Sequence, residues 1–135
     1  MGWFLYWQSW VEEREVGKLN IFLVAIGGFF GAVTRYFVAN KLSFLNNSFP
    51  AATFFVNLSG SFLLGLIMGG FPSSKWTLLV GIGFLGSYTT FSTFKVEMIN
   101  QLRKKKWKPA LIYMFLSYFG GIVLAFLGFL TGLRL

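Results

Sequence analysis

Four long apolar segments separated by short polar stretches dominate the hydrophobic pattern of the chain. They cover residues 20–39, 51–70, 76–99 and 109–131. Each is close to the ~20 residues that a helix needs to cross the hydrocarbon core of a bilayer. Their apolar positions are continuous rather than alternating, which favours helices over the strands of a membrane barrel. The pattern therefore predicts an all-α integral membrane protein with four transmembrane helices.

Short connections between these segments leave no room for a soluble domain. We expect residues 19–135 to form a single four-helix transmembrane domain and residues 1–18 to form an N-terminal extension. Trp3, Trp7 and Trp10 fall on one helical face of this extension, as in a helix that lies at a membrane interface. The extension has neither a basic n-region nor a small-residue cleavage site, so we do not expect a signal peptide.

Composition narrows the chemistry that the chain can perform. Hydrophobic residues make up 56% of the sequence and charged residues 12%, which is typical of an integral membrane protein. The absence of cysteine excludes disulfides and thiolate metal sites. The absence of histidine removes the commonest general base and metal ligand. An intramembrane enzyme therefore has few candidate residues, and we do not expect an enzyme.

The net charge of +8 comes largely from one run, "RKKKWK" at residues 103–108. In a multi-pass protein of a cell membrane, such a run is typical of an anchor for anionic lipid headgroups. Nothing around it could form a surface that reads nucleic acid, so the expected partner is the lipid bilayer. We expect the protein in the bacterial plasma or inner membrane.

Positive charges are spread almost evenly over the two sides of the predicted bundle. The side that holds the N-terminus carries four, at Arg14, Lys18, Lys75 and Arg134. The opposite side carries six, at Lys41, Arg103, Lys104, Lys105, Lys106 and Lys108. This bias is weak for the positive-inside rule, so insertion in both orientations is open. Because four helices leave little room for a solute path, we expect a homodimer with an inverted copy.

Small and polar residues form stripes on three of the four segments. Gly27 and Gly31 make a GxxxG face for close helix approach, with Arg35 one turn further on. Arg35 is either a snorkelling side chain or a fixed positive charge at an aqueous vestibule. The other two stripes comprise Thr53, Asn57, Ser61 and Gly65, and Tyr113, Ser117, Gly121 and Gly128. Each stripe either joins helices or lines a path, and Asn57 is the most costly member to leave unpaired.

The third segment carries signs of a break. Gly81, Gly83 and Gly86 precede a hydroxyl-rich run, and glycine weakens a helix while hydroxyls can satisfy freed backbone groups. We expect the helix to break near the bilayer midplane, with a continuous helix as the alternative. Phe91 and Phe94 share a face, which indicates core packing or ring edges turned to a small anion.

Three stretches together resemble the Fluc (CrcB) fluoride channel family. They are "GGFFGAVTRY" at 27–36, "FFVNLSGSFLLG" at 54–65 and "GFLGSYTTFSTF" at 83–94. The resemblance covers about residues 19–131, in order and spacing. It implies an antiparallel, dual-topology homodimer that exports cytoplasmic fluoride passively through two pores.

The resemblance also implies roles for individual residues. A central structural sodium ion (Na+) would be held by the backbone carbonyls of Gly86 and Thr89, and Arg35 would lie at the vestibule. Pore-lining positions would be Phe91, Phe94, Asn57, Thr90, Ser92, Tyr113 and Ser117. Two features depart from the family pattern: the aromatic N-terminal extension, and Gly121 where another hydroxyl is expected.

Two other functions remain open at this stage. A small four-helix multidrug or cation antiporter needs a carboxylate inside the membrane, typically in its first helix, and residues 20–39 contain none. A non-transporting membrane assembly subunit would use the polar stripes only to hold helices together.

Overall fold

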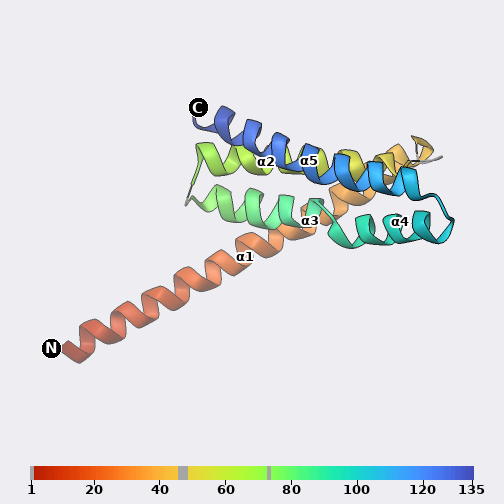
Figure 1. Ribbon diagram of the computed structural model, residues 1–135. Coiled ribbons are helices and arrows are strands. Elements are labelled where there is room, and N and C mark those ends of the chain that lie inside the picture. Colours follow the sequence, from red (N-terminus) through yellow and green to blue (C-terminus); the bar gives the residue numbers. More distant parts are fainter. Residues whose placement is uncertain (1, 46–48, 73) are drawn as a thin grey trace.

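The computed structural model describes residues 2–45, 49–72 and 74–135, without the side chains of residues 2–16 and 45. Helix α1 (Gly2–Leu42) is continuous over 41 residues and leads into a short 3-10 turn, η1 (Ser43–Leu45). Residues 17–42 of this helix are long and apolar enough to cross a membrane, and its N-terminal part projects beyond the other helices (Figure 1). The side chains of Trp3, Trp7 and Trp10 lie outside the described residues, so the interfacial position of the extension stays a prediction.

The rest of the chain folds into helices that run back and forth along one bundle (Figure 1). They are α2 (Ala51–Gly70), η2 (Thr77–Leu85), α3 (Gly86–Tyr88), α4 (Phe91–Arg103) and α5 (Trp107–Gly132). In the described part of the chain, four stretches are long and apolar enough to cross a membrane, with η2, α3 and α4 forming the third. The prediction of four transmembrane helices in an all-α fold is confirmed.

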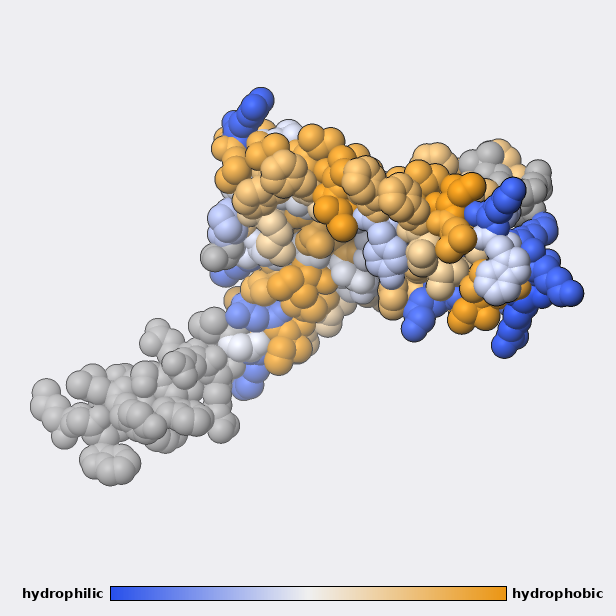
Figure 2. Space-filling model, in the orientation of Figure 1, coloured by the Kyte–Doolittle hydropathy of each residue, from blue (hydrophilic) through white to orange (hydrophobic). Residues whose placement is uncertain are grey.

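Large apolar side chains cover the outside of the bundle rather than its core. Phe22 is 65% exposed and Ile122 is 70% exposed, and many others share this exposure. Figure 2 shows this apolar surface in orange between blue, charged groups at the two ends of the bundle. The buried core is small, with Val56, Leu85 and Tyr88 at its centre. This distribution suits a protein whose solvent is lipid, so the chain is a multi-pass membrane protein.

Glycines allow the helices of the bundle to approach closely. A Cβ atom on Gly31 of α1 would overlap the carbonyl oxygen of Phe84 in η2. A Cβ atom on Gly128 of α5 would overlap the carbonyl oxygen of Phe62 in α2. Small residues at helix contacts are typical of membrane bundles, where packing rather than the hydrophobic effect joins helices. The close approach that the Gly27–Gly31 spacing predicts is therefore present, with η2 as the partner.

The third span is broken near its midpoint, as the sequence predicts, and the break lies a few residues after its glycines. Thr89 (ψ 156°) and Thr90 (φ −145°, ψ 120°) are extended, whereas Gly86 keeps helical angles. The break falls midway along the 27-residue stretch Thr77–Arg103. Upstream of it, η2 is wound as a π-helix, a wider form that the sequence did not predict and that often marks functional sites.

Candidate functional site

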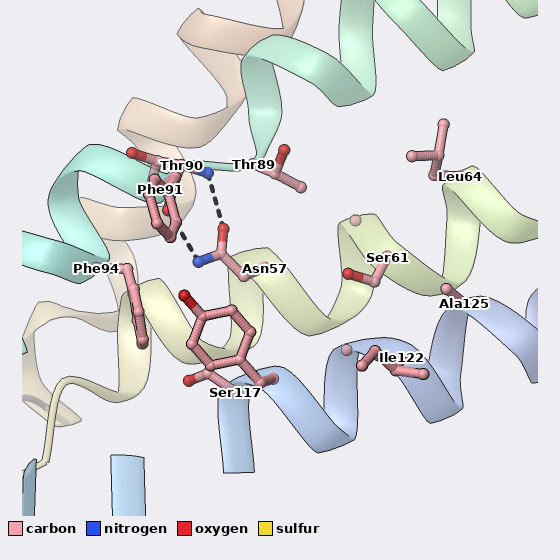
Figure 3. A pocket seen from close by; sticks show the side chains of 13 residues that line it. Asn57, Ser61, Leu64, Thr89, Thr90, Phe91, Phe94, Ser117, Ile122 and Ala125 are labelled. Atoms are coloured by element: carbon pink, nitrogen blue, oxygen red, sulfur yellow. Dashed lines mark hydrogen bonds between the residues drawn. The ribbon is translucent and has the colours of Figure 1, made fainter. Parts of the chain in front are cut away.

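Asn57 on α2 holds the broken backbone with two hydrogen bonds. Its Nδ2 donates to the Thr90 carbonyl at 2.9 Å, and its Oδ1 accepts from the Thr90 N–H at 2.8 Å (Figure 3). A peptide unit without a helical partner is costly inside a membrane. Asn57 satisfies both polar groups of that residue, and this explains how the helix can break where lipid offers no hydrogen bonds.

Thr90 also starts the helix that follows the break. Its Oγ1 accepts from the Thr93 N–H at 3.3 Å and donates to Thr93 Oγ1 at 3.0 Å. This is the N-cap arrangement, in which a side-chain oxygen satisfies one of the free N–H groups of the first helical turn. The hydroxyl-rich run thus contains the cap of α4, a local signal that is readable from the sequence.

Arg35 reaches the break from α1. Its Nη1 donates to the Thr89 carbonyl at 3.2 Å, so the guanidinium lies against one of the two carbonyls that the resemblance assigns to sodium. Gly86 is exposed, and a Cβ atom there would meet nothing within 4 Å. Among the described residues, no group of three or more His, Cys, Asp or Glu side chains could hold a metal. A cation at this place would therefore depend on backbone oxygens.

A cavity of about 400 Å³ opens beside the break, between α2, α4 and α5 (Figure 3). Its polar lining comes from Asn57, Ser61, Thr89, Thr90 and Ser117, and no acidic side chain belongs to it. The rest of the lining is aromatic, aliphatic or small: Gly60, Leu64, Phe91, Phe94, Tyr118, Gly121, Ile122 and Ala125. The cavity thus combines hydroxyl and amide groups with aromatic rings.

Phe91 and Phe94 form the aromatic wall of this cavity. Their rings stack with centroids 6.0 Å apart and planes at 24°. Phe94 is buried and also contacts the rings of Tyr113 at 5.0 Å and Tyr118 at 5.6 Å. Phe91, by contrast, is 60% exposed in the single chain. One ring is therefore fixed by its neighbours while the other presents its surface outward.

Five of the seven residues expected to line a pore lie at the cavity, and two do not. Ser92 is exposed on the outer side of α4, and Tyr113 is fully buried behind Phe94. Ser117 belongs to the lining of the cavity, but its Oγ atom is buried and has no hydrogen-bond partner among the described residues. That these residues conduct an ion stays a prediction.

Glu97 lies next to the site, a role that its position in the sequence did not predict. Its Oε1 accepts from Thr53 Oγ1 at 2.8 Å, and its Oε2 accepts from the Tyr113 hydroxyl at 2.8 Å. One carboxylate thereby joins α2, α4 and α5 next to the cavity. The available signal was that Glu97 is the only carboxylate in the four apolar segments, because such residues are rare inside membranes and usually have partners.

The sequence of this chain is similar to those of known proteins. The model of the family described as CrcB-like protein, Camphor Resistance (CrcB), matches residues 22–129. Among curated relatives, "Fluoride-specific ion channel FluC 2" of Bacillus thuringiensis subsp. konkukian is 47% identical over 115 residues, covering 84% of this chain and 98% of that relative.

Two further relatives come from other bacterial genera. "Fluoride-specific ion channel FluC 1" of Geobacillus kaustophilus is 44% identical over 109 residues, covering 81% of this chain and 94% of the relative. The protein of the same name from Listeria monocytogenes is 41% identical over 115 residues, covering 84% and 98%. The family match spans all four helices of the bundle and the broken third span, and the chain therefore belongs to the CrcB family.

Proposed function

We propose that this chain is a fluoride-selective channel that lets the ion leave the cytoplasm passively. The observation that carries the proposal is the cavity beside the break, where hydroxyl, amide and aromatic groups converge without a carboxylate in the lining. Fluoride is small and strongly hydrated, so a path for it must replace water with closely placed hydrogen-bond donors. The names of the relatives agree with this chemistry.

The working unit of this proposal is a homodimer of two inverted copies. Ser92 and Thr93 expose hydroxyls, and Phe91 exposes its ring, in the middle of a membrane span. Polar groups at that depth normally face protein or water rather than lipid. Because the break lies midway along its span, inversion about an axis in the membrane plane would bring two breaks to the same depth. Each copy would then complete the other's cavity, giving two pores.

A sodium ion between the two breaks is part of the same proposal. The carbonyl oxygens of Gly86 and Thr89 are hard, neutral ligands of the kind that alkali cations accept, and two copies would supply four of them. The exposed position of Gly86 leaves space for a partner to approach. A carbonyl oxygen has two lone pairs, so the Thr89 oxygen can keep its bond to Arg35 while it contacts a cation. The ion would fix the two copies in register.

The test is ion efflux from liposomes that contain the purified protein. Vesicles loaded with potassium fluoride receive valinomycin, and an electrode records fluoride outside. We expect rapid fluoride release, little chloride release from vesicles loaded with potassium chloride, and neither from protein-free vesicles. Changing Phe91→Ile should lower the fluoride rate at least ~10-fold, since the exposed ring of the cavity wall is lost.

Two results would argue against the proposal. Equal release of chloride and fluoride would show that the protein does not select fluoride. Proton-coupled uptake of a cationic drug without fluoride flux would support the antiporter instead. A protein that is inert in both assays would fit the assembly subunit.

A further inference from the structure

Lys95 on α4 places its ammonium group over the face of Phe91. The distance from Nζ to the ring centroid is 5.4 Å, which is within the range of a cation–π contact. The two residues are four positions apart, so they lie one above the other on the same face of the helix. This is the ring that forms the outward part of the cavity wall.

The depth of Lys95 makes its charge unusual. It is the fifth residue of α4, one turn after the break and eight residues before Arg103, where the 27-residue span ends. At a rise of ~1.5 Å per residue, it is about 12 Å from that end. Its ammonium lies over Phe91, which is the residue nearer the break. The side chain of Lys95 thus extends toward the middle of the span and away from the nearer membrane surface.

The carboxylate nearest to Lys95 in the sequence is hydrogen-bonded to other residues. Glu97 is two residues away, but its two oxygens accept hydrogen bonds from Thr53 and Tyr113. The other three acidic residues of the chain, Glu12, Glu13 and Glu15, belong to the N-terminal extension. Lys95 is exposed in the single chain, and an ionised side chain at such depth normally faces a water-filled space or a charged partner.

A cation over a ring changes how that ring meets an anion. Aromatic rings have negative faces and positive edges. A positive charge over one face of Phe91 draws π-electron density toward itself and makes the ring edge more positive. Phe94 stacks on Phe91, so the effect acts beside the second ring of the wall. The ammonium itself also attracts anions from the water that reaches it.

We propose that Lys95 raises the rate of anion entry by charging the mouth of the path beside Phe91. This inference rests on the proposed function and adds to it a residue that sets the rate of anion entry. An anion about 4 Å from one fixed positive charge is attracted by about 1 kcal/mol in a watery environment, which corresponds to about a five-fold rise in local anion concentration, and the attraction is stronger where water is sparse. The contribution of Lys95 to the rate of anion entry should decline at high salt, because dissolved ions screen its charge.

The test compares variants of the full chain in the liposome efflux assay, with potassium fluoride as the probe. Lys95→Met removes the charge and keeps the length of the side chain, while Lys95→Arg keeps the charge and the ring contact. The matched control is Lys75→Met, which removes an exposed lysine just before the third span, on the far side of the break from Phe91. Rates are measured at low fluoride, in ~20 mM and ~500 mM impermeant salt.

We expect Lys95→Met to reduce the rate about three- to ten-fold in low salt and less than two-fold in high salt. Lys95→Arg and Lys75→Met should stay within about two-fold of the parent in both. Size-exclusion profiles equal to the parent's would confirm that the variants are assembled. If Lys95→Met matches the parent in low salt, or if Lys95→Arg loses as much as Lys95→Met, the inference is wrong while the channel proposal stands. If the parent itself conducts no fluoride, both fall.

Discussion

At the scale of single residues, the fold depends on a few side chains that replace missing backbone partners. Asn57 bonds to both the N–H and the carbonyl of Thr90, and Glu97 accepts from two different helices. Each of these groups would be costly if left alone in an apolar medium. Their hydrogen bonds remove this cost, and each bond also constrains where a neighbouring helix can lie.

The first prediction concerns Asn57→Asp. A carboxylate can still accept from the Thr90 N–H but can no longer donate to the Thr90 carbonyl, and the two oxygens would repel each other. Leaving that buried carbonyl unpaired costs about 1–3 kcal/mol. We expect at least a ~10-fold lower fluoride rate in liposomes, because the break and its cavity lose their shape. The matched control is Asn100→Asp, at an exposed position on α4, which should conduct like the parent.

Some of these residue roles could be read from the sequence and others could not. Asn57 stands out because an amide in an apolar segment needs partners, and the four-residue stripe gives the face on which it lies. Its partner could not be known, since Thr90 is 33 positions away and only the fold brings the two together. The resemblance implies a pore position for Tyr113, which stays a prediction; in the single chain its hydroxyl donates to Glu97 and its ring lies against Phe94.

At the scale of elements, two pairs of helices carry most of the packing. α2 lies along α5, and α1 lies along η2, in both cases with glycines where the backbones meet. The GxxxG spacing on α1 makes one of these contacts predictable. The break falls midway along its span, as predicted, but the residues at which it occurs were less predictable. Gly81 and Gly83 lie inside the π-helix η2, and the broken residues are those whose backbone groups Asn57, Arg35 and the Thr90 cap can satisfy.

The second prediction tests the contact between α2 and α5. In Gly128→Ala the new methyl group would overlap the Phe62 carbonyl, so the helices must separate. Overpacking of this kind costs about 1–3 kcal/mol. We expect a lower melting midpoint of the detergent-solubilised protein. The matched control is Gly81→Ala, whose methyl group would meet Ile67 Cγ2 at an ordinary 3.4 Å. Equal midpoints for the two variants would contradict the packing described here.

At the scale of the whole molecule, charge is distributed so that orientation is only weakly specified. The basic turn between α4 and α5 lies at the end of the bundle opposite the C-terminus (Figure 1). Lysines on this turn are balanced in part by the positive residues at the other end, such as Lys75 and Arg134. Orientation in the membrane should therefore respond to small changes in the turn.

The third prediction uses this balance. Replacing Lys104, Lys105 and Lys106 by Gln makes the N-terminal side the more positive one, so more copies should place both termini in the cytoplasm. C-terminal fusions to green fluorescent protein and to alkaline phosphatase, which are active on opposite sides, report the two orientations. We expect both fusions of the parent to be active, and a several-fold shift toward fluorescence in the variant.

Replacing the same three lysines by Arg keeps the charge and is the matched control, with no shift expected. A parent chain in which only one of the two fusions is active would have a single orientation. That outcome would exclude the inverted pair and, with it, the shared sodium site.

The paired bonds of Asn57 have a consequence for which sequences can adopt this fold. A carboxamide has the same donor and acceptor as a peptide group, so Asn57 acts toward Thr90 like one rung of a neighbouring β-strand. A carboxylate, a hydroxyl or an alkyl group cannot form this pair of hydrogen bonds. Glutamine has the same amide group but holds it one methylene further from the backbone. The side-chain amide of Asn57 thus supplies the hydrogen bonds that the broken helix lacks inside lipid. Substitution at this position is therefore restricted by the need for one donor and one acceptor placed as in a peptide group, and not by size or polarity alone.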